Sequence, residues 1–95
     1  MGMSNTFICR ACGYKAFVSG GLDTGGTYKT QTISCEKCLE LFDAIVLWTH
    51  DWTTVQLRCP KRKSHPFRPW NHPDACPRCG TIMEVEEDGE ILLWD

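Results

Sequence analysis

The sequence lacks the features of an exported or membrane-inserted chain. After Met1 it reads GMSNTF, without the basic residues and long apolar run of a secretory signal. No segment approaches the ~20 apolar residues that a membrane-spanning helix requires. No window shows a helical hydrophobic period with capping residues at its ends. We therefore expect a cytoplasmic chain with reduced cysteines, little or no helix and no membrane partner.

Glycine is gathered in GGLDTGG (residues 20–26), but this stretch lacks the lysine and the helix that follow a phosphate-binding loop. Glycine permits positive φ angles, so we interpret the stretch as a hairpin loop. Such a loop would place the strand that leaves Cys12 beside the strand that enters Cys35. A second hairpin is predicted at Asp88–Gly89, a two-residue turn signal between two apolar runs.

Short runs rich in Val, Ile, Thr and aromatic residues predict a mostly β chain. Residues 1–5 are expected to be a disordered start. The expected strands cover residues 6–8, 14–19, 27–34, 43–49, 53–58, 82–86 and 90–94.

The chain has 95 residues, so its hydrophobic core is small and is expected to need covalent or metal staples. Seven cysteines are available for this purpose. Disulfides are one interpretation, but an odd count would leave one thiol unpaired. The CxxC spacing suits two thiolates that converge on one ion, and we favour metal binding. The three CxxC pairs are Cys9/Cys12, Cys35/Cys38 and Cys76/Cys79.

The hairpin predicted at residues 20–26 would bring the first two CxxC pairs to the same end of two strands. We therefore expect a first metal site made of Cys9, Cys12, Cys35 and Cys38. The alternative is a cross-braced arrangement of alternating pairs, which the predicted hairpin disfavours.

The second expected site takes Cys59, Cys76 and Cys79 and needs one histidine to complete a tetrahedron. His65 is favoured, because with Cys59 it closes a widened loop and restores a two-plus-two pattern. His72 and His50 are the alternatives.

Two zinc ions are the expected cofactors, with iron as the alternative at the four-cysteine site, since four thiolates hold either metal. A catalytic zinc keeps one coordination position open for water, whereas eight ligands fill two sites completely. The ligand count therefore favours structural metals and a protein that is not an enzyme.

The segments CRACGY (residues 9–14) and CPRCG (residues 76–80) resemble the metal-binding knuckles of rubredoxin and of zinc ribbons. The order CxxCGY, glycine-rich loop, TxTxxCxxC and CPxCG is also similar to small uncharacterised bacterial zinc-ribbon proteins. This resemblance implies a fold and a metal, but no established activity. It suggests a first ribbon over residues 6–54 and a second over residues 55–95, the latter ending in a hairpin.

Charge is unevenly spread: residues 55–79 hold six basic side chains and one acidic one, whereas residues 80–95 hold six acidic and no basic ones. Basic and aromatic side chains interleaved in this way suit single-stranded nucleic acid, although they could instead neutralise the thiolates nearby. The candidate contacts are Arg58, Lys61, Arg62, Lys63, Phe67, Arg68 and Trp70.

The C-terminal EILLWD could form an exposed edge strand offered to another chain. We therefore expect a zinc-binding interaction module, with a protein partner favoured over nucleic acid. The alternative is a rubredoxin-like iron–thiolate electron carrier. Such a carrier would need its two knuckles, residues 9–14 and 76–80, on the same ion, which would leave Cys35 and Cys38 without a site.

Overall fold

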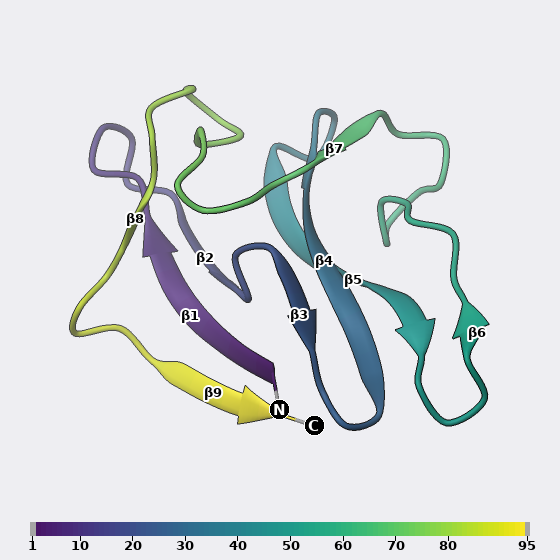
Figure 1. Ribbon diagram of the computed structural model, residues 1–95. Helices are drawn as coiled ribbons and strands as arrows, with labels where there is room; N and C mark the ends of the chain where they lie inside the picture. Colours follow the sequence, from purple (N-terminus) through teal and green to yellow (C-terminus); the bar gives the residue numbers. More distant parts are fainter. Residues whose placement is uncertain (1, 95) are drawn as a thin grey trace.

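The computed structural model describes residues 2–94, which form nine strands in two antiparallel sheets and contain no helix (Figure 1). The mostly β class predicted from the sequence is confirmed. Within this range no helix is long and apolar enough to cross a membrane. The strands are β1 (Gly2–Ile8), β2 (Lys15–Val18), β3 (Leu22–Thr24), β4 (Tyr28–Cys35), β5 (Glu40–Trp48), β6 (Thr53–Thr54), β7 (Phe67–Pro69), β8 (Glu84–Val85) and β9 (Ile91–Trp94).

The first sheet is built around β1, with β2 on one side and both β8 and β9 on the other. A turn closed by the Gly89 N–H on the Glu86 carbonyl (3.0 Å) separates β8 from β9. The hairpin predicted at Asp88–Gly89 is therefore wrong, because β8 and β9 follow one another along β1 and do not pair together (Figure 1).

The start of the chain is ordered by the same sheet. Residues 2–5, which we expected to be disordered, pair with the whole of β9, from Gly2↔Trp94 to Asn5↔Ile91. The expectation for these residues is wrong because a strand from the other end of the chain supplies their hydrogen bonds. Met1 lies outside the described residues.

The second sheet is built around β4. β5 pairs with β4 along its full length, and β6 extends the sheet beyond β5. β3 and β7 lie one after the other along the opposite side of β4 (Figure 1). The sequence predicted neither β3 nor β7, since both are short and depend on β4 for their pairing.

The glycine-rich stretch changes sheets instead of closing a hairpin between β2 and β4. Gly20 has a φ of 88°, and a Cβ there would lie 2.5 Å from the Phe7 ring. The N–H groups of Gly20 and Gly21 donate to Thr32 Oγ1 at 2.9 and 3.1 Å. Because this crossing sends β2 to β1 and β3 to β4, the hairpin expected between Cys12 and Cys35 is wrong.

The main hydrophobic core lies where the two sheets meet. Trp70 is 0% exposed, packs edge-on against Phe7 at 5.3 Å between ring centroids, and donates its indole N–H to the Ala75 carbonyl at 2.8 Å. Val18 and Met83 are buried beside them. Burying a tryptophan with its N–H satisfied makes it a main apolar contributor to a core this small.

Candidate metal centres

Two of the cysteine turns share one backbone conformation. In the first, the Cys9 N–H donates to Tyr14 O and the Gly13 N–H donates to Cys9 O, both at 2.8 Å. In the last, the Gly80 N–H donates to Cys76 O at 2.9 Å. Gly13 and Gly80 have φ angles of 83° and 82°, a region that glycine enters without steric cost. Each turn therefore brings two thiols to one side of a tight loop.

The third turn has the same closing hydrogen bond but no glycine. The Leu39 N–H donates to Cys35 O at 3.0 Å, and Leu39 has a φ of 56°. A side chain in this left-handed region costs about 1–2 kcal/mol. The Cys38 N–H also points at Cys35 Sγ, at 3.3 Å, a contact that favours the thiolate.

The first candidate centre, called here the four-thiol group, joins the two glycine-closed turns. Its Sγ atoms lie within 4.8 Å of one another, with 3.3 Å between Cys9 and Cys79 and 3.7 Å between Cys12 and Cys76. Thiolates on one tetrahedral ion are ~3.8 Å apart when each metal–sulfur bond is ~2.3 Å. The group consists of Cys9, Cys12, Cys76 and Cys79.

The second candidate centre, the three-thiol group, consists of Cys35, Cys38, Cys59 and His65. The Nδ1 atom of His65 lies 3.6, 3.5 and 3.8 Å from the sulfurs of Cys35, Cys38 and Cys59. Tetrahedral nitrogen and sulfur ligands are expected ~3.6 Å apart. The geometry thus identifies Nδ1 as the nitrogen that faces the centre.

The ligand sets expected from the sequence are wrong in their pairing. The structure uses the same eight residues, but it joins the first CxxC pair to the last. The other four ligands, which lie between these pairs in the sequence, form the second group. The reason is strand order. β8 pairs with the end of β1 and brings Cys76 to Cys9, whereas β7 pairs with β4 and carries His65 to Cys35. Each group, and each sheet, therefore draws on both sides of residue 54.

The other two histidines lie away from both groups. His72 packs its ring against Phe7, at 5.1 Å between ring centroids. His50 is exposed, with Nε2 3.5 Å from Asp51 Oδ2.

The surroundings of the four-thiol group lower the pKa of one thiol and raise the pKa of another. Hydrogen bonds from the backbone and hydroxyl of Thr81 lower the pKa of Cys79 to about 6. A backbone hydrogen bond from Tyr14 lowers the pKa of Cys12, but desolvation and the neighbouring thiols outweigh it and raise the pKa to about 12. Four thiolates this close repel one another, so the donor set calls for a cation at its centre.

In the three-thiol group, too, the pKa of one thiol is lowered and that of another is raised. Burial raises the pKa of Cys59, but backbone hydrogen bonds from Arg62 and Lys61 outweigh it and bring the pKa to about 6. Desolvation, followed by the thiols of Cys35 and Cys59, raises the pKa of Cys38 to about 11. A bound cation would remove this repulsion here as well.

Side chains from the turns connect the two groups. The Leu41 N–H donates to the Tyr14 hydroxyl at 2.9 Å, and Arg78 Nε donates to Leu39 O at 3.1 Å. The Arg78 guanidinium also stacks over the Tyr14 ring, 4.4 Å from its centroid. Because Tyr14 and Arg78 belong to the four-thiol turns and Leu39 to a three-thiol turn, each centre helps to position the other.

The basic segment 58–70 is only partly available for contacts. Trp70 cannot stack on a base, because it is fully buried, so that expectation is wrong. Arg68 forms two hydrogen bonds with the Asp74 carboxylate, at 2.9 and 3.2 Å. Lys61 pairs with Glu40 at 3.3 Å.

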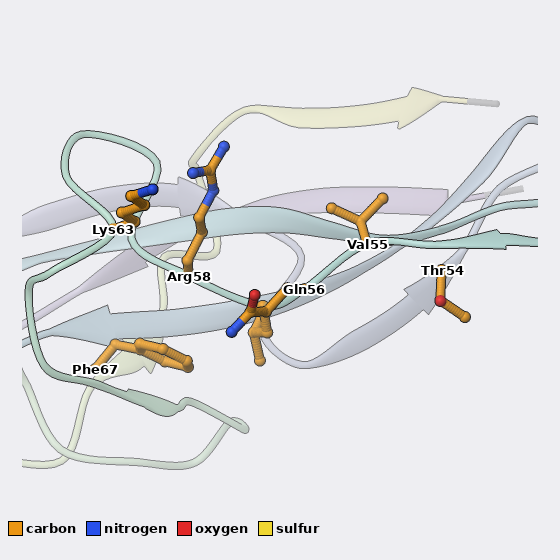
Figure 2. A pocket seen from close by; sticks show the side chains of 7 residues that line it. Thr54, Val55, Gln56, Arg58, Lys63 and Phe67 are labelled. Carbon is orange, nitrogen blue, oxygen red and sulfur yellow. The ribbon is translucent and has the colours of Figure 1, made fainter.

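Part of this segment lines a shallow groove of about 500 Å³. Figure 2 shows Arg58 and Lys63 extending away from the Phe67 ring, and Gln56 on the other side of Arg58 from Lys63. Neither Arg58 nor Lys63 forms an ion pair within residues 2–94. Arg58 and Lys63 are thus free to meet an anion in the groove. Arg62 is exposed outside the groove and also forms no ion pair within the same residues.

The sequence holds a signal for this pairing, the glycine that follows two of the three CxxC pairs. CxxCG occurs at Cys9 and at Cys76, whereas the pair at Cys35 is followed by Leu39. Like turns are joined in the four-thiol group, so the shared glycine distinguished its members.

Comparisons with protein-family models, with curated proteins and with solved structures find no match to this chain.

Proposed function

We propose that the protein is a non-enzymatic, cytoplasmic zinc-binding interaction module. Each donor set has four ligands, so neither leaves a coordination position open for a substrate. A set of three thiols and one imidazole favours zinc over iron. The ions would act by holding the turns, and through them the two sheets, in place.

The observation that carries the interaction role is the exposed apolar strand β9. Within the described residues it pairs only with β1, so its outer edge keeps free backbone donors and acceptors. Ile91, Leu92 and Leu93 are 62%, 52% and 59% exposed. An apolar edge of this kind is a site for a partner chain, which could add a strand or pack on the side chains.

The proposal is tested by comparing partners of two variants with those of the wild type in cells of the source organism. Ile91→Lys with Leu93→Lys places two charges on β9, and Leu22→Lys is the control on exposed strand β3, where Leu22 is 67% exposed. We expect a stoichiometric partner that the β9 variant loses and the control keeps, with two zinc ions in each protein. Equal recovery by all three proteins would argue against β9 as the interface.

A second candidate is an iron–thiolate electron carrier, and one observation favours it. The two turns that resemble rubredoxin knuckles, residues 9–14 and 76–80, supply one four-thiol group. Cys12 and Cys79 are exposed, which would bring a redox iron close to the surface. A red protein with visible thiolate-to-iron absorption would support the carrier, and a colourless protein with bound zinc would exclude it.

Single-stranded nucleic acid is the alternative partner, and the groove in Figure 2 is where it would bind. Phosphate contacts there should weaken steeply between low and physiological salt. Arg58→Ala with Lys63→Ala should reduce the salt slope, whereas Lys61→Ala, which removes a residue paired with Glu40, should change it less. Absence of binding at low salt would leave the protein-partner proposal alone.

A further inference from the structure

A hollow of about 320 Å³ lies between the two sheets, away from both metal centres. Its walls carry three aromatic rings, Phe17 from β2, Tyr28 from β4 and Trp94 from β9. Tyr28 and Trp94 stack, with ring centroids 4.9 Å apart and planes 12° apart. The face of an aromatic ring attracts cations, and no basic side chain is among the described residues of the lining.

Two polar groups in the lining are incompletely satisfied. Thr30 is 3% exposed, and its Oγ1 atom has no hydrogen-bond partner. A buried hydroxyl without a partner costs about 1–3 kcal/mol, so such an atom calls for a ligand.

The second group is Asp43, the one charged side chain among the described residues of the lining. Its carboxylate accepts hydrogen bonds from the Ser19 N–H at 2.9 and 3.1 Å and from the Thr32 hydroxyl at 2.6 Å. It has no ion-pair partner within residues 2–94. Burial raises the pKa of Asp43, although hydrogen bonds from Thr32 and Ser19 oppose the rise. Within residues 2–94, therefore, no cationic side chain neutralises the Asp43 carboxylate.

We propose that this hollow binds the ammonium group of a lysine side chain presented by a protein partner. An ammonium has three donors and could pair with the Asp43 carboxylate while its alkyl stem passes the aromatic walls. Thr30 Oγ1 is itself covered, so the ammonium would reach it only by moving the side chains next to it. Leu92 and Trp94 belong to β9 and also line the hollow, so the site is continuous with the exposed edge strand. The inference rests on the proposed interaction role for the identity of the partner, but the pocket itself does not depend on it.

The test is an NMR titration of the metal-loaded full-length protein with Nα-acetyl-lysine-N-methylamide as the probe. The Nε-acetylated form of the same compound is the matched control, because it keeps the stem and lacks the charge. We expect saturable shifts at Phe17, Tyr28, Thr30 and Trp94 with the charged probe and none with the neutral one. Asp43→Asn should weaken binding at least about tenfold, since it removes the charge and keeps the acceptor oxygen.

Thr30→Val is the second variant and keeps the proposal testable if Asp43→Asn fails to fold. It replaces the unpartnered hydroxyl with a methyl group of similar size and should weaken binding about threefold. Leu22→Lys, on β3 outside the hollow, should bind the probe as the wild type does. Equal binding of the neutral probe, unchanged affinity in Asp43→Asn or in Thr30→Val, or no shifts at all would overturn the inference.

Tighter binding of the corresponding arginine compound would also overturn the choice of lysine. These results are independent of the β9 partner experiment: loss of a partner in that experiment with no probe binding here would leave the function standing and remove the pocket. Probe binding together with no β9-dependent protein partner would leave the pocket standing and remove the proposed interaction role.

Discussion

The pairing of the two metal centres makes a sharp prediction about double cysteine variants. In the structure Cys12 shares a centre with Cys79, and Cys38 belongs to the other centre. Cys12→Ala with Cys79→Ala should therefore leave one zinc per chain. Cys12→Ala with Cys38→Ala should leave none. Sequential pairing of the CxxC segments predicts the opposite pattern, because it would place Cys12 and Cys38 on one ion.

The expected magnitudes follow from burial and from the ligand count. Cys12 and Cys79 are exposed, so their truncation leaves no cavity, and any loss of stability reports on the metal. Removing a group that only hydrogen-bonds to a metal ligand already lowers the metal affinity about 10–100-fold. Losing one direct thiolate should thus cost at least about 100-fold, or about 2.7 kcal/mol, and losing two should abolish the site.

Loss of both ions should unfold the chain. A structural zinc stabilises a small domain by roughly 10–16 kcal/mol, which is as large as the total stability of an ordinary domain at about 5–15 kcal/mol. The Cys12/Cys38 variant should therefore lose its dispersed NMR signals, and the Cys12/Cys79 variant should keep those around the three-thiol group.

Native mass spectrometry of both variants, with single variants alongside, counts the ions directly. One zinc in the Cys12/Cys38 variant and none in the Cys12/Cys79 variant would refute the nested arrangement. No zinc in either would indicate the alternating arrangement, in which the first CxxC pair meets Cys59 and His65.

Three further predictions follow from the same contacts. His65→Ala should lower bound zinc from two to about one per chain, whereas His72→Ala should keep both ions, and elemental analysis of the two proteins decides between these histidines. Acid should release the metal, because protons compete with the ion for the thiolates. The pKa values of Cys59 and Cys79 are already lowered from 9.0 to about 6 before a metal binds, and a bound ion lowers them further, so a zinc-sensitive dye should report release only as the pH falls below about 6. Trp70→Ala should lower the free energy of unfolding by about 3–5 kcal/mol in chemical denaturation, and a cost below 1 kcal/mol would contradict its place in the core.

In the second half of the chain, two predicted strands are much longer than the observed ones. The run at residues 53–58 forms a strand only at β6, Thr53–Thr54, and the run at 82–86 only at β8, Glu84–Val85, beside an isolated bridge between Ile82 and Ala75. Both had the composition of strands, but a strand persists only where a neighbour supplies hydrogen bonds. β9 was predicted well because its apolar residues coincide with a partner in β1.

The sequence by itself determined what is local in the metal centres. The CxxC spacing sets two thiols on one turn, and a glycine at positions 13 and 80 permits the positive φ that closes it. These properties depend on a few neighbouring residues, so they can be read without knowing the fold.

Only the tertiary structure decided which turns share an ion. That choice depends on β1 pairing with β8 and on β4 pairing with β7, contacts between residues far apart in the chain. The crossing at Gly20 was decisive, because it separated β2 from β4 and thereby removed the hairpin that would have joined Cys12 to Cys35. The hollow with Asp43 and Thr30 has the same origin: its lining comes from both sheets, and no single stretch of sequence contains it.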